Sequence, residues 1–372
     1  MTDPRRTQAR RELLLALRDP ARTRALEPQA WSALVSTARD ANLLGALTSR
    51  LREAGLRACP QAQLHLDGMY AMGQRQHLSI QWEAHQLQAA LGVLEVPVLL
   101  LKGSAYVMGF PEIGAGRLFG DIDILVPKAA LADVESRLML NGWVSDKTDP
   151  YDQRYYREWM HELPPMSHLR RGTVLDVHHN ILPLTARNAP DAQAILARSR
   201  PLPGLPALRL PCPEDLLVHC LTHLMHDGEL HNGLRDLHDA HRMVGLFAAA
   251  EGFWTRLESV AAGNDLAGPV SLGLKLLERL FGTEVPAATL ATLSASASPD
   301  WAWQRWSPVY EAALLEPSTG VTSWRAAWAR QRLYVRSHAL RMPRGLLIRH
   351  LLRKAWMRRR ASGTDNAAAP PN

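Results

Sequence analysis

The chain has 372 residues, of which 47% are hydrophobic and 21% charged, with three cysteines and a formal net charge of +7. This length predicts two packed units, or one core with appendages, and the residue balance is that of an ordinary globular protein rather than a disordered or collagen-like one. Three cysteines without a C-x-x-C pair argue against a disulfide framework, a structural zinc site and a redox motif.

The sequence gives no indication of membrane insertion or export. No stretch reaches the ~20 unbroken apolar residues that a membrane-spanning helix needs. The apolar run at residues 13–17 is too short for the core of a signal peptide. We therefore expect a cytoplasmic protein, and the low cysteine content fits a reducing compartment.

Residues 1–92 predict an N-terminal helical segment. Trp31, Leu34 and Ala38 recur at helical spacing, and a long helix is expected from about Gln61 to Leu91. The next segment, residues 93–210, changes to the patterns of a small α/β or α+β sheet unit. Its predicted elements are strands at 96–101, 121–126, near Trp143 and at 173–177, a helix at 128–140, and an irregular stretch before the last strand.

A proline-rich run at residues 201–213 predicts a linker, and residues 211–328 predict a C-terminal helical domain. Residues 329–372 are expected to form a basic amphipathic helix followed by a disordered tail. Residues 330–360 hold eleven Lys or Arg and no acid, which leaves a net charge of 7 − 11 = −4 for the rest of the chain. Such a helix can pack on its own protein, lie on an anionic membrane surface or bind a nucleic-acid backbone, and we rank nucleic acid last.

The acidic residues of the sheet unit are the candidate metal ligands. Asp121 and Asp123 are two residues apart in a predicted strand, so both carboxylates lie on one face, roughly 7 Å apart at the backbone. Like charges this close require a cation, and an all-oxygen site suits Mg²⁺, with Mn²⁺ as the alternative ion. Asp176 lies in another aliphatic strand, where a lone carboxylate is costly to bury, and is the candidate third ligand. An isolated Asp-x-Asp pair, by contrast, is often only a solvated strand face.

A candidate phosphate site precedes these acids. Gly103 and Ser104 follow a predicted strand, where a small residue lets backbone N–H groups approach a phosphate. Lys102 and Arg117 are the candidate cations that neutralise the remaining phosphate charge.

The combined pattern resembles the nucleotidyltransferase superfamily of DNA polymerase β, and more closely a bacterial family of uncharacterised nucleotidyltransferases. The segments that carry the resemblance are Leu101–Gly103, Gly116-Arg117, Gly120–Val126, Leu175–His178 and Arg235–Asp239. The resemblance implies an α+β fold: a small mixed-sheet polymerase-β-like core flanked by N-terminal and C-terminal helical segments. It also implies metal ligation by Asp121, Asp123 and Asp176 and phosphate contact by Gly103 and Ser104.

Several histidines surround this pattern. His219, His223 and His226 recur at helical spacing and are followed by Asp227, which loosely imitates the HD-type metal phosphohydrolases. We favour the interpretation that His223, Arg235 and Asp239 form a wall of the nucleotide site, with Arg235 and Asp239 paired one turn apart. His178 shares the face of Asp176, where it can orient that carboxylate or act as a base; a buried structural histidine and an exposed strand end remain alternatives.

The sequence thus predicts an Mg²⁺-dependent enzyme that moves a nucleoside monophosphate from a nucleoside triphosphate to an acceptor hydroxyl. The family resemblance suggests surface-polysaccharide or peptide modification, and the acceptor itself is not specified. Two alternatives stay open: an HD-like metal phosphohydrolase, and a nucleotide-binding scaffold without catalytic activity.

Overall fold

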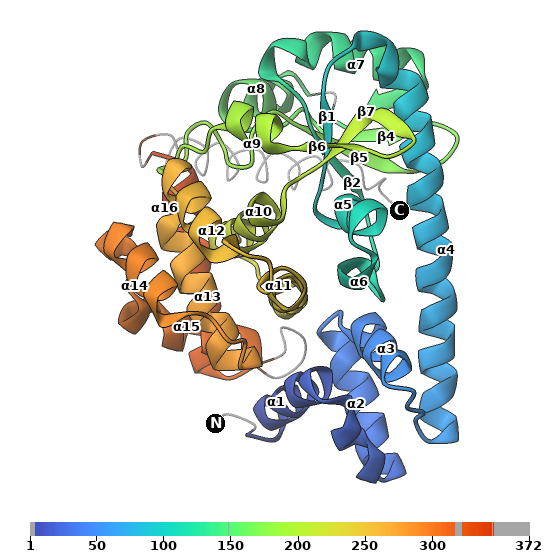
Figure 1. The fold of residues 1–372 in the computed structure, drawn as a ribbon, viewed down its shortest axis with the longest axis vertical. Helices are drawn as coiled ribbons and strands as arrows, with labels where there is room; N and C mark the ends of the chain where they lie inside the picture. Colours follow the sequence, from blue (N-terminus) through green and yellow to red (C-terminus); the bar gives the residue numbers. More distant parts are fainter. Residues whose placement is uncertain (1–3, 148, 317–321, 344, 346–372) are drawn as a thin grey trace, which may run out of the picture.

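A computed structural model describes residues 4–147, 149–316, 322–343 and 345. Its N-terminal segment is helical, as predicted, and comprises α1 (Pro4–Arg18), η1 (Pro20–Ala25), α2 (Pro28–Asp40), α3 (Leu44–Glu53) and α4 (Pro60–Leu91). Proline occupies the first turn of α2 and α4, where its missing N–H has no helical partner to lose. Figure 1 shows α4 running along the edge of the molecule from the N-terminal helices to the sheet.

The centre of the molecule is one mixed sheet of seven strands in the order β3-β4-β5-β2-β1-β7-β6. The strands are β1 (Val98–Leu101), β2 (Ile122–Leu125), β3 (Trp143–Ser145), β4 (Met166–His168), β5 (Val174–His178), β6 (Arg200–Leu202) and β7 (Leu205–Leu210). β2 is antiparallel to β1 and parallel to β5, while β1 is parallel to β7. The strands β1 and β2 are fully buried, which explains why they consist mostly of aliphatic residues.

Short helices connect the strands. α5 (Lys102–Gly109) and α6 (Pro111–Gly114) follow β1, while η3 (Lys128–Ala130) and α7 (Leu131–Leu140) follow β2 and confirm the helix predicted at 128–140. A 3₁₀ turn, η2 (Gly92–Leu94), links α4 to β1. The stretch expected to be irregular contains α8 (Pro150–Trp159) and β4, and α9 (Ala192–Arg198) follows β5.

The linker predicted for the proline-rich run is wrong. Residues 200–210 form the β6–β7 hairpin, in which Arg200 pairs with Leu210 and Leu202 with Leu205. Pro201 lies in β6, the edge strand, where its missing N–H does not interrupt a central ladder. The hairpin therefore completes the sheet beside β1.

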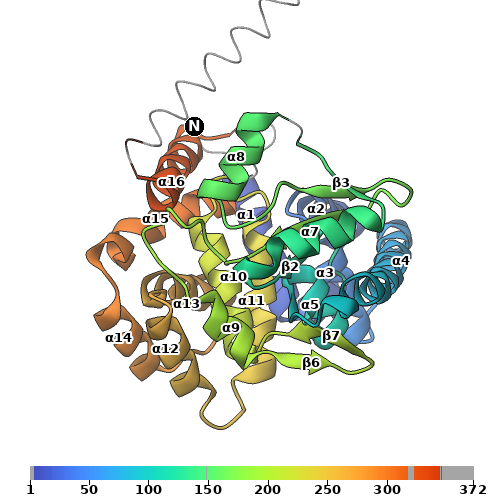
Figure 2. The same cartoon turned by 90° about the horizontal axis from the view of Figure 1, so that it is seen from above.

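The C-terminal segment is helical and comprises α10 (Pro213–His226), α11 (Gly233–Phe247), α12 (Phe253–Gly263), α13 (Ala267–Phe281), α14 (Ala287–Ser296), η4 (Pro299–Trp301), α15 (Trp303–Leu315) and α16 (Trp324–Arg341). These helices lie on the opposite side of the molecule from α4 in both views of the ribbon (Figures 1 and 2). One hydrophobic cluster extends from Leu13 to Leu340, so the N-terminal helices, the sheet and the C-terminal helices share a core.

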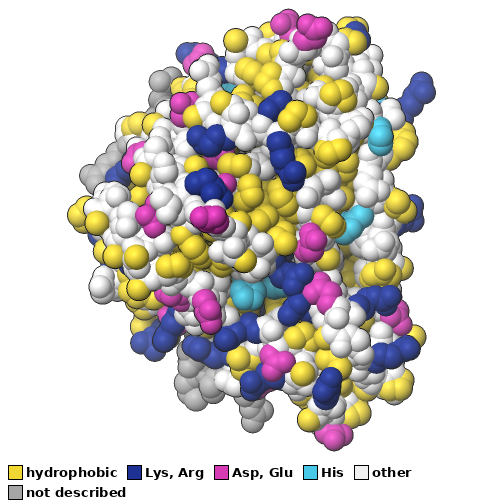
Figure 3. All heavy atoms as spheres, in the orientation of Figure 1, with side chains coloured by type: hydrophobic (Ala, Val, Ile, Leu, Met, Phe, Trp, Pro, Cys, Tyr) yellow, Lys and Arg dark blue, Asp and Glu magenta, His cyan; other side chains and the backbone are white. Residues whose placement is uncertain are grey.

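The basic segment predicted at 330–360 lies partly in α16, and residues 344 and 346–360 are outside the described residues. Within α16, Arg330 donates to the carbonyl of Glu316, and buried Arg336 donates to the carbonyl of Met225 at 3.0 Å. This part of the segment thus packs on the protein. Across the described ranges we find no helix with the length and apolar character that crossing a bilayer requires. Basic, acidic and apolar side chains are interspersed on the face drawn in Figure 3.

Candidate active site

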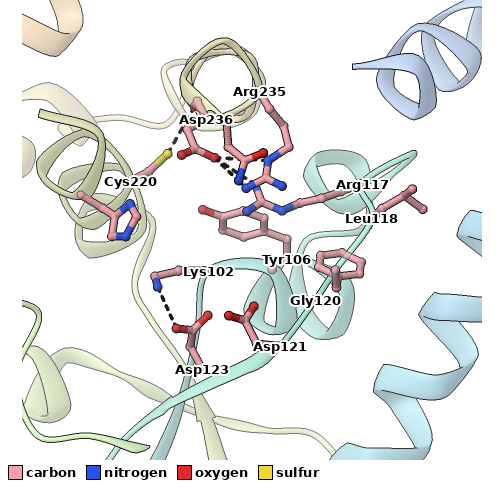
Figure 4. A pocket seen from close by; sticks show the side chains of 14 residues that line it. Lys102, Tyr106, Arg117, Leu118, Gly120, Asp121, Asp123, Cys220, Arg235 and Asp236 are labelled. Carbon is pink, nitrogen blue, oxygen red and sulfur yellow. Dashed lines mark hydrogen bonds and ion pairs between the residues drawn. The ribbon is translucent and has the colours of Figure 1, made fainter. Parts of the chain in front are cut away.

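The predicted acids meet at the centre of the sheet. β2 and β5 run parallel in a register that pairs Asp123 with Asp176, and Asp121 lies directly before β2. Figure 4 shows the carboxylates of Asp121 and Asp123 side by side at the edge of a cavity, with Lys102 above Asp123. Two separate chain segments therefore bring three carboxylates to one place, because aligned strands carry paired residues on the same face.

The cavity has a volume of about 350 Å³. Its lining includes seven residues singled out from the sequence: Lys102, Gly103, Arg117, Asp121, Asp123, His223 and Arg235. It also includes seven that were not predicted to be site residues: Tyr106, Leu118, Phe119, Gly120, Cys220, Asn232 and Asp236. Tyr106 follows Gly103 by three residues in α5, a spacing that gives a sequence signal for its position. For Cys220 and Asn232 the sequence offers no such signal.

Asp123 is the most strongly paired of the three acids. It is 3% exposed, and its Oδ1 lies 2.7 Å from the Lys102 ammonium nitrogen and 3.0 Å from Nε2 of His178. Burial alone would raise the pKa of Asp123, but Lys102 and His178 outweigh that effect and hold the pKa well below its ordinary value. Asp123 is therefore ionised at neutral pH.

The pKa values of Asp176 and Asp121 are shifted upward, in the opposite direction to that of Asp123. Burial, followed by the negative charge of Asp123, raises the pKa of Asp176 to about 7 and raises that of Asp121 as well. Asp176 Oδ1 is buried and has no hydrogen-bond partner among the described residues. Two carboxylates with raised pKa values beside a permanently charged one make a site that a cation would stabilise.

The donor set fits a divalent ion. Asp123, Asp176 and His178 each offer a ligand atom, and these atoms lie within 4.8 Å of one another. The orphaned oxygen of Asp176 supplies an unsatisfied hard ligand of the kind that Mg²⁺ and Mn²⁺ prefer. His178, predicted to orient Asp176 or act as a base, instead has its Nε2 on Asp123.

The turn between β1 and α5 forms the cavity wall next to Asp123. Lys102 adopts a left-handed backbone conformation, with φ of 45°, which sends its side chain back over Asp123. Gly103 lies against Phe119, whose ring would be 2.3 Å from an added Cβ. Ser104 is buried, and its hydroxyl donates to the carbonyl of Leu101 at 2.8 Å, so in the described structure its side chain faces the strands and not the cavity.

Two arginines form the opposite wall, each held by an acid from α11. Arg117 makes a close ion pair with Asp239 and lies over the ring of Tyr106, 5.1 Å from its centroid. Arg235 pairs with its neighbour Asp236 at 3.2 Å, so the ion pair predicted between Arg235 and Asp239 is wrong. The loop before β2 supplies the partner of Asp239, and the wall couples that loop to α11.

The histidines of α10 divide between the cavity and the core. His223 lines the cavity, and burial lowers its pKa well below the ordinary value, so it is neutral there. His226 Nδ1 donates to the carbonyl of Thr222 at 2.8 Å, and the Asp227 carboxylate accepts from the backbone N–H groups of Glu229 and Leu230. In the described part of the chain, the two clusters with the spacing of a metal site include none of the residues of the HD-like hypothesis.

Comparison with known proteins gives one match. A family model described as an uncharacterised nucleotidyltransferase matches residues 27–282, from the start of α2 to the end of α13. The matched region includes the whole sheet, the cavity and both arginine–acid pairs. No curated protein and no solved structure matches the chain.

Proposed function

Because the chain belongs to the family of uncharacterised nucleotidyltransferases, we propose that it transfers a nucleoside monophosphate from a nucleoside triphosphate to an acceptor hydroxyl, in a reaction that needs a divalent metal ion. In this reaction the acceptor oxygen forms a bond to the α-phosphorus while the bond from that phosphorus to the β-phosphate oxygen breaks. The acceptor loses its hydroxyl proton, and pyrophosphate leaves.

The observation that carries the proposal is the pairing of Asp123 with Asp176 on adjacent parallel strands, with Asp121 beside them. Carboxylates from two segments rarely share a buried position unless something positive lies between them, because each raises the cost of ionising the others. Lys102 neutralises only one of the three, since its ammonium nitrogen is bonded to Asp123. The remaining negative charge supports a role in holding a metal ion.

Asp121, Asp123 and Asp176 would hold the ion, for which Mg²⁺ is the first candidate and Mn²⁺ the second. When bound, such an ion neutralises the charge of the triphosphate and lowers the pKa of a coordinated hydroxyl. The protein's own cations complete the site: Lys102 and Arg235 line the cavity and are positioned to bind phosphate oxygens. Arg117 fixes the cavity wall through Asp239, and Gly103 lines the cavity at the start of α5, where backbone N–H groups can bind a phosphate.

His223 and Tyr106 belong to the same cavity and would contact the nucleoside or the acceptor. His223 is neutral, so it offers one donor and one acceptor nitrogen rather than a charge. The acceptor classes that the family suggests are sugars of surface polysaccharides and peptides. We propose a cytoplasmic location for this reaction. Basic residues of the segment at 330–360 other than Arg330 and Arg336, which pack on the protein, are the candidate contact to an anionic inner membrane surface.

The test is a pyrophosphate-release assay with Mg²⁺, each of the four nucleoside triphosphates, and sugars and peptides as acceptors. We expect release by the wild type and a loss on the order of 10²-fold or more in the double variant Asp121→Ala/Asp123→Ala. The matched control is Asp300→Ala, which removes an exposed carboxylate that pairs with Arg187 and does not line the cavity. Undiminished release by the double variant would reject the proposal.

Two other outcomes separate the rival functions. An HD-like phosphohydrolase keeps its activity in the double variant and loses it on His226→Ala. A scaffold is stabilised against thermal unfolding by nucleotide with Mg²⁺ but releases no pyrophosphate with any acceptor.

A further inference from the structure

A second cluster of metal-binding side chains lies on the other side of His178. The loop after α8 runs antiparallel to the end of β5: Glu162 forms a bridge with His178, and the Leu163 N–H donates to the carbonyl of Val177 at 2.8 Å. The carbonyl of His161 accepts from the N–H of His179 at 2.7 Å. Backbone hydrogen bonds therefore fix His161 and Glu162 against the strand that carries His178.

The side chains of His161, Glu162 and His178 converge on one point. Each offers a ligand atom, and the three atoms lie within 4.8 Å of one another. The imidazole rings of His161 and His178 face each other with centroids 5.2 Å apart and planes tilted by 30°. Glu162 is 17% exposed at its side chain, so an ion from solvent can reach the cluster.

The nitrogen atoms of this cluster lack the hydrogen bonds that a purely structural role would give them. Nδ1 of His161 and Nδ1 of His178 are both buried without an aligned hydrogen-bond partner among the described residues. Nδ1 of His178 is nevertheless 3.1 Å from Glu162 Oε2. Two ligand atoms bound at ~2.0–2.1 Å to one tetrahedral ion are about 3.3 Å apart, so the separation matches two ligands of a shared ion.

The hydrogen bond at Nε2, the other ring nitrogen of His178, sets the tautomer of the ring. Nε2 lies 3.0 Å from Oδ1 of the Asp123 carboxylate, which can only accept, so Nε2 carries the proton. In the neutral ring this leaves the lone pair on Nδ1, directed to the side of Glu162. A carboxylate that holds the distal N–H of a metal-binding histidine is the usual outer partner in zinc sites.

We propose that His161, Glu162 and His178 form a binding site for a transition-metal dication of the Zn²⁺ class. Two imidazoles and one carboxylate suit Zn²⁺ and its neighbours, whereas Mg²⁺ prefers oxygen ligands alone. Three protein ligands leave a fourth position for water or another small ligand. The bound ion would pin the loop after α8 to β5 and fix the ring that donates to Asp123. The site does not depend on the proposed nucleotidyl transfer.

Cobalt titration of the metal-free, full-length protein tests the proposal. Four-coordinate Co²⁺ gives intense visible absorption, while six-coordinate Co²⁺ is nearly colourless. We expect one equivalent of Co²⁺ to produce the four-coordinate spectrum, Zn²⁺ to displace it, and excess Mg²⁺ to leave it unchanged. His161→Gln and Glu162→Gln should each weaken binding by at least 10-fold.

Two controls locate the ion. His231→Gln removes an exposed histidine that contacts Glu229 at 3.3 Å and belongs to neither metal-binding cluster of the described residues, and Asp176→Asn removes a carboxylate that is outside the cluster of His161, Glu162 and His178; both should keep the cobalt spectrum. X-ray absorption of the zinc-loaded wild type, which needs no variant, should show two imidazole ligands. A six-coordinate spectrum, persistence of binding in His161→Gln and Glu162→Gln, or loss of binding in Asp176→Asn alone would overturn the proposal. None of these results bears on pyrophosphate release.

Discussion

Asp176 is the residue on which the candidate site depends most. Its carboxylate is placed opposite Asp123 by the register of β2 and β5, and one of its oxygens is buried without a partner among the described residues. In the metal-free protein this arrangement is destabilising, because the pKa of Asp176 is raised to about 7 by burial and by Asp123. An acid whose folded pKa exceeds its unfolded value lowers stability as pH rises from its unfolded pKa to its folded pKa.

Asp176→Asn should therefore stabilise the metal-free protein at pH 8 by about 1–3 kcal/mol, because it removes an unpaired buried charge. At pH 4, close to the ordinary pKa of an aspartate, Asp176 is protonated in the folded state and partly protonated in the unfolded state, so the gain should largely vanish. Urea unfolding of the variant and the wild type, in the presence of a chelator, measures the stability difference at each of the two pH values. A variant that is equally or less stable than the wild type at pH 8 would show that the carboxylate is already satisfied without metal.

At the level of single residues, the acids were predictable and their partners were not. The alternation of aliphatic and acidic residues around Asp121 and Asp123 fixes the face on which the carboxylates lie. The partner of Arg117 is Asp239, which comes from a helix more than a hundred residues further along the chain. Local spacing favours Arg235, one turn before Asp239, as the partner of Asp239. Only the packing of α11 on the loop before β2 shows that this partner is Arg117.

At the scale of elements, the turn from β1 to α5 shapes the cavity. Lys102 has a positive φ there, and Gly103 contacts the Phe119 ring closely enough to exclude a side chain. Phe119 is itself held by its backbone N–H, which donates to the side-chain oxygen of Gln76 in α4 at 2.8 Å. The turn thus has little freedom to move away from an added methyl group.

Gly103→Ala should destabilise the protein by about 1–3 kcal/mol, because the new methyl group meets the Phe119 ring. It should also weaken nucleotide binding, because displacing Phe119 changes the lining of the cavity. Gly120→Ala is the matched control: Gly120 lines the same cavity, but an added Cβ there has no described atom within 4 Å. Thermal unfolding and titration with a triphosphate analogue compare the two variants; equal effects of both would contradict the steric account.

The β6–β7 hairpin could not be predicted from the local sequence, which favours a linker. Pro201 and Pro206 remove two backbone donors and favour a linker. Pro201, however, lies in the edge strand β6, and Pro206 lies next to the hairpin turn in β7, before Leu208 and Arg209, which pair with β1. Leu205, Leu208 and Leu210 of β7 are buried, so the hairpin joins the core through its aliphatic residues. Position within the sheet, which local sequence does not contain, decides whether proline is permitted.

For the whole molecule, one shared core joins the helical segments to the sheet and buries many histidines. Burial lowers the pKa of His219 and His226 to about 3 and that of His179 and His241 to about 4. A histidine that is neutral when folded and protonated when unfolded makes stability fall as pH decreases below its unfolded pKa. Asp176, Asp121 and His178, whose pKa values are raised, act in the opposite sense, but they are fewer than the buried histidines with lowered pKa values.

The free energy of unfolding should therefore fall as the pH is lowered from about 6.5 to 5, by up to about 1.4 kcal/mol per pH unit for each such histidine. His226→Gln should reduce the dependence of the free energy of unfolding on pH by the contribution of one histidine. His226 is a buried residue of α10 that contacts Asn188 and Thr222. Urea midpoints measured at four pH values give the slope. A flat profile, or an unchanged slope in His226→Gln, would contradict this account.

The central claim is that three carboxylates from β2, its preceding loop and β5 hold the ion that serves a nucleoside triphosphate. The measurement that tests it most directly is a crystal structure with Mg²⁺ and a non-hydrolysable triphosphate analogue. We predict an ion coordinated by oxygens of Asp123 and Asp176, with the phosphates beside Lys102 and Gly103. A nucleotide bound elsewhere, or an ion that contacts neither Asp123 nor Asp176, would contradict the account.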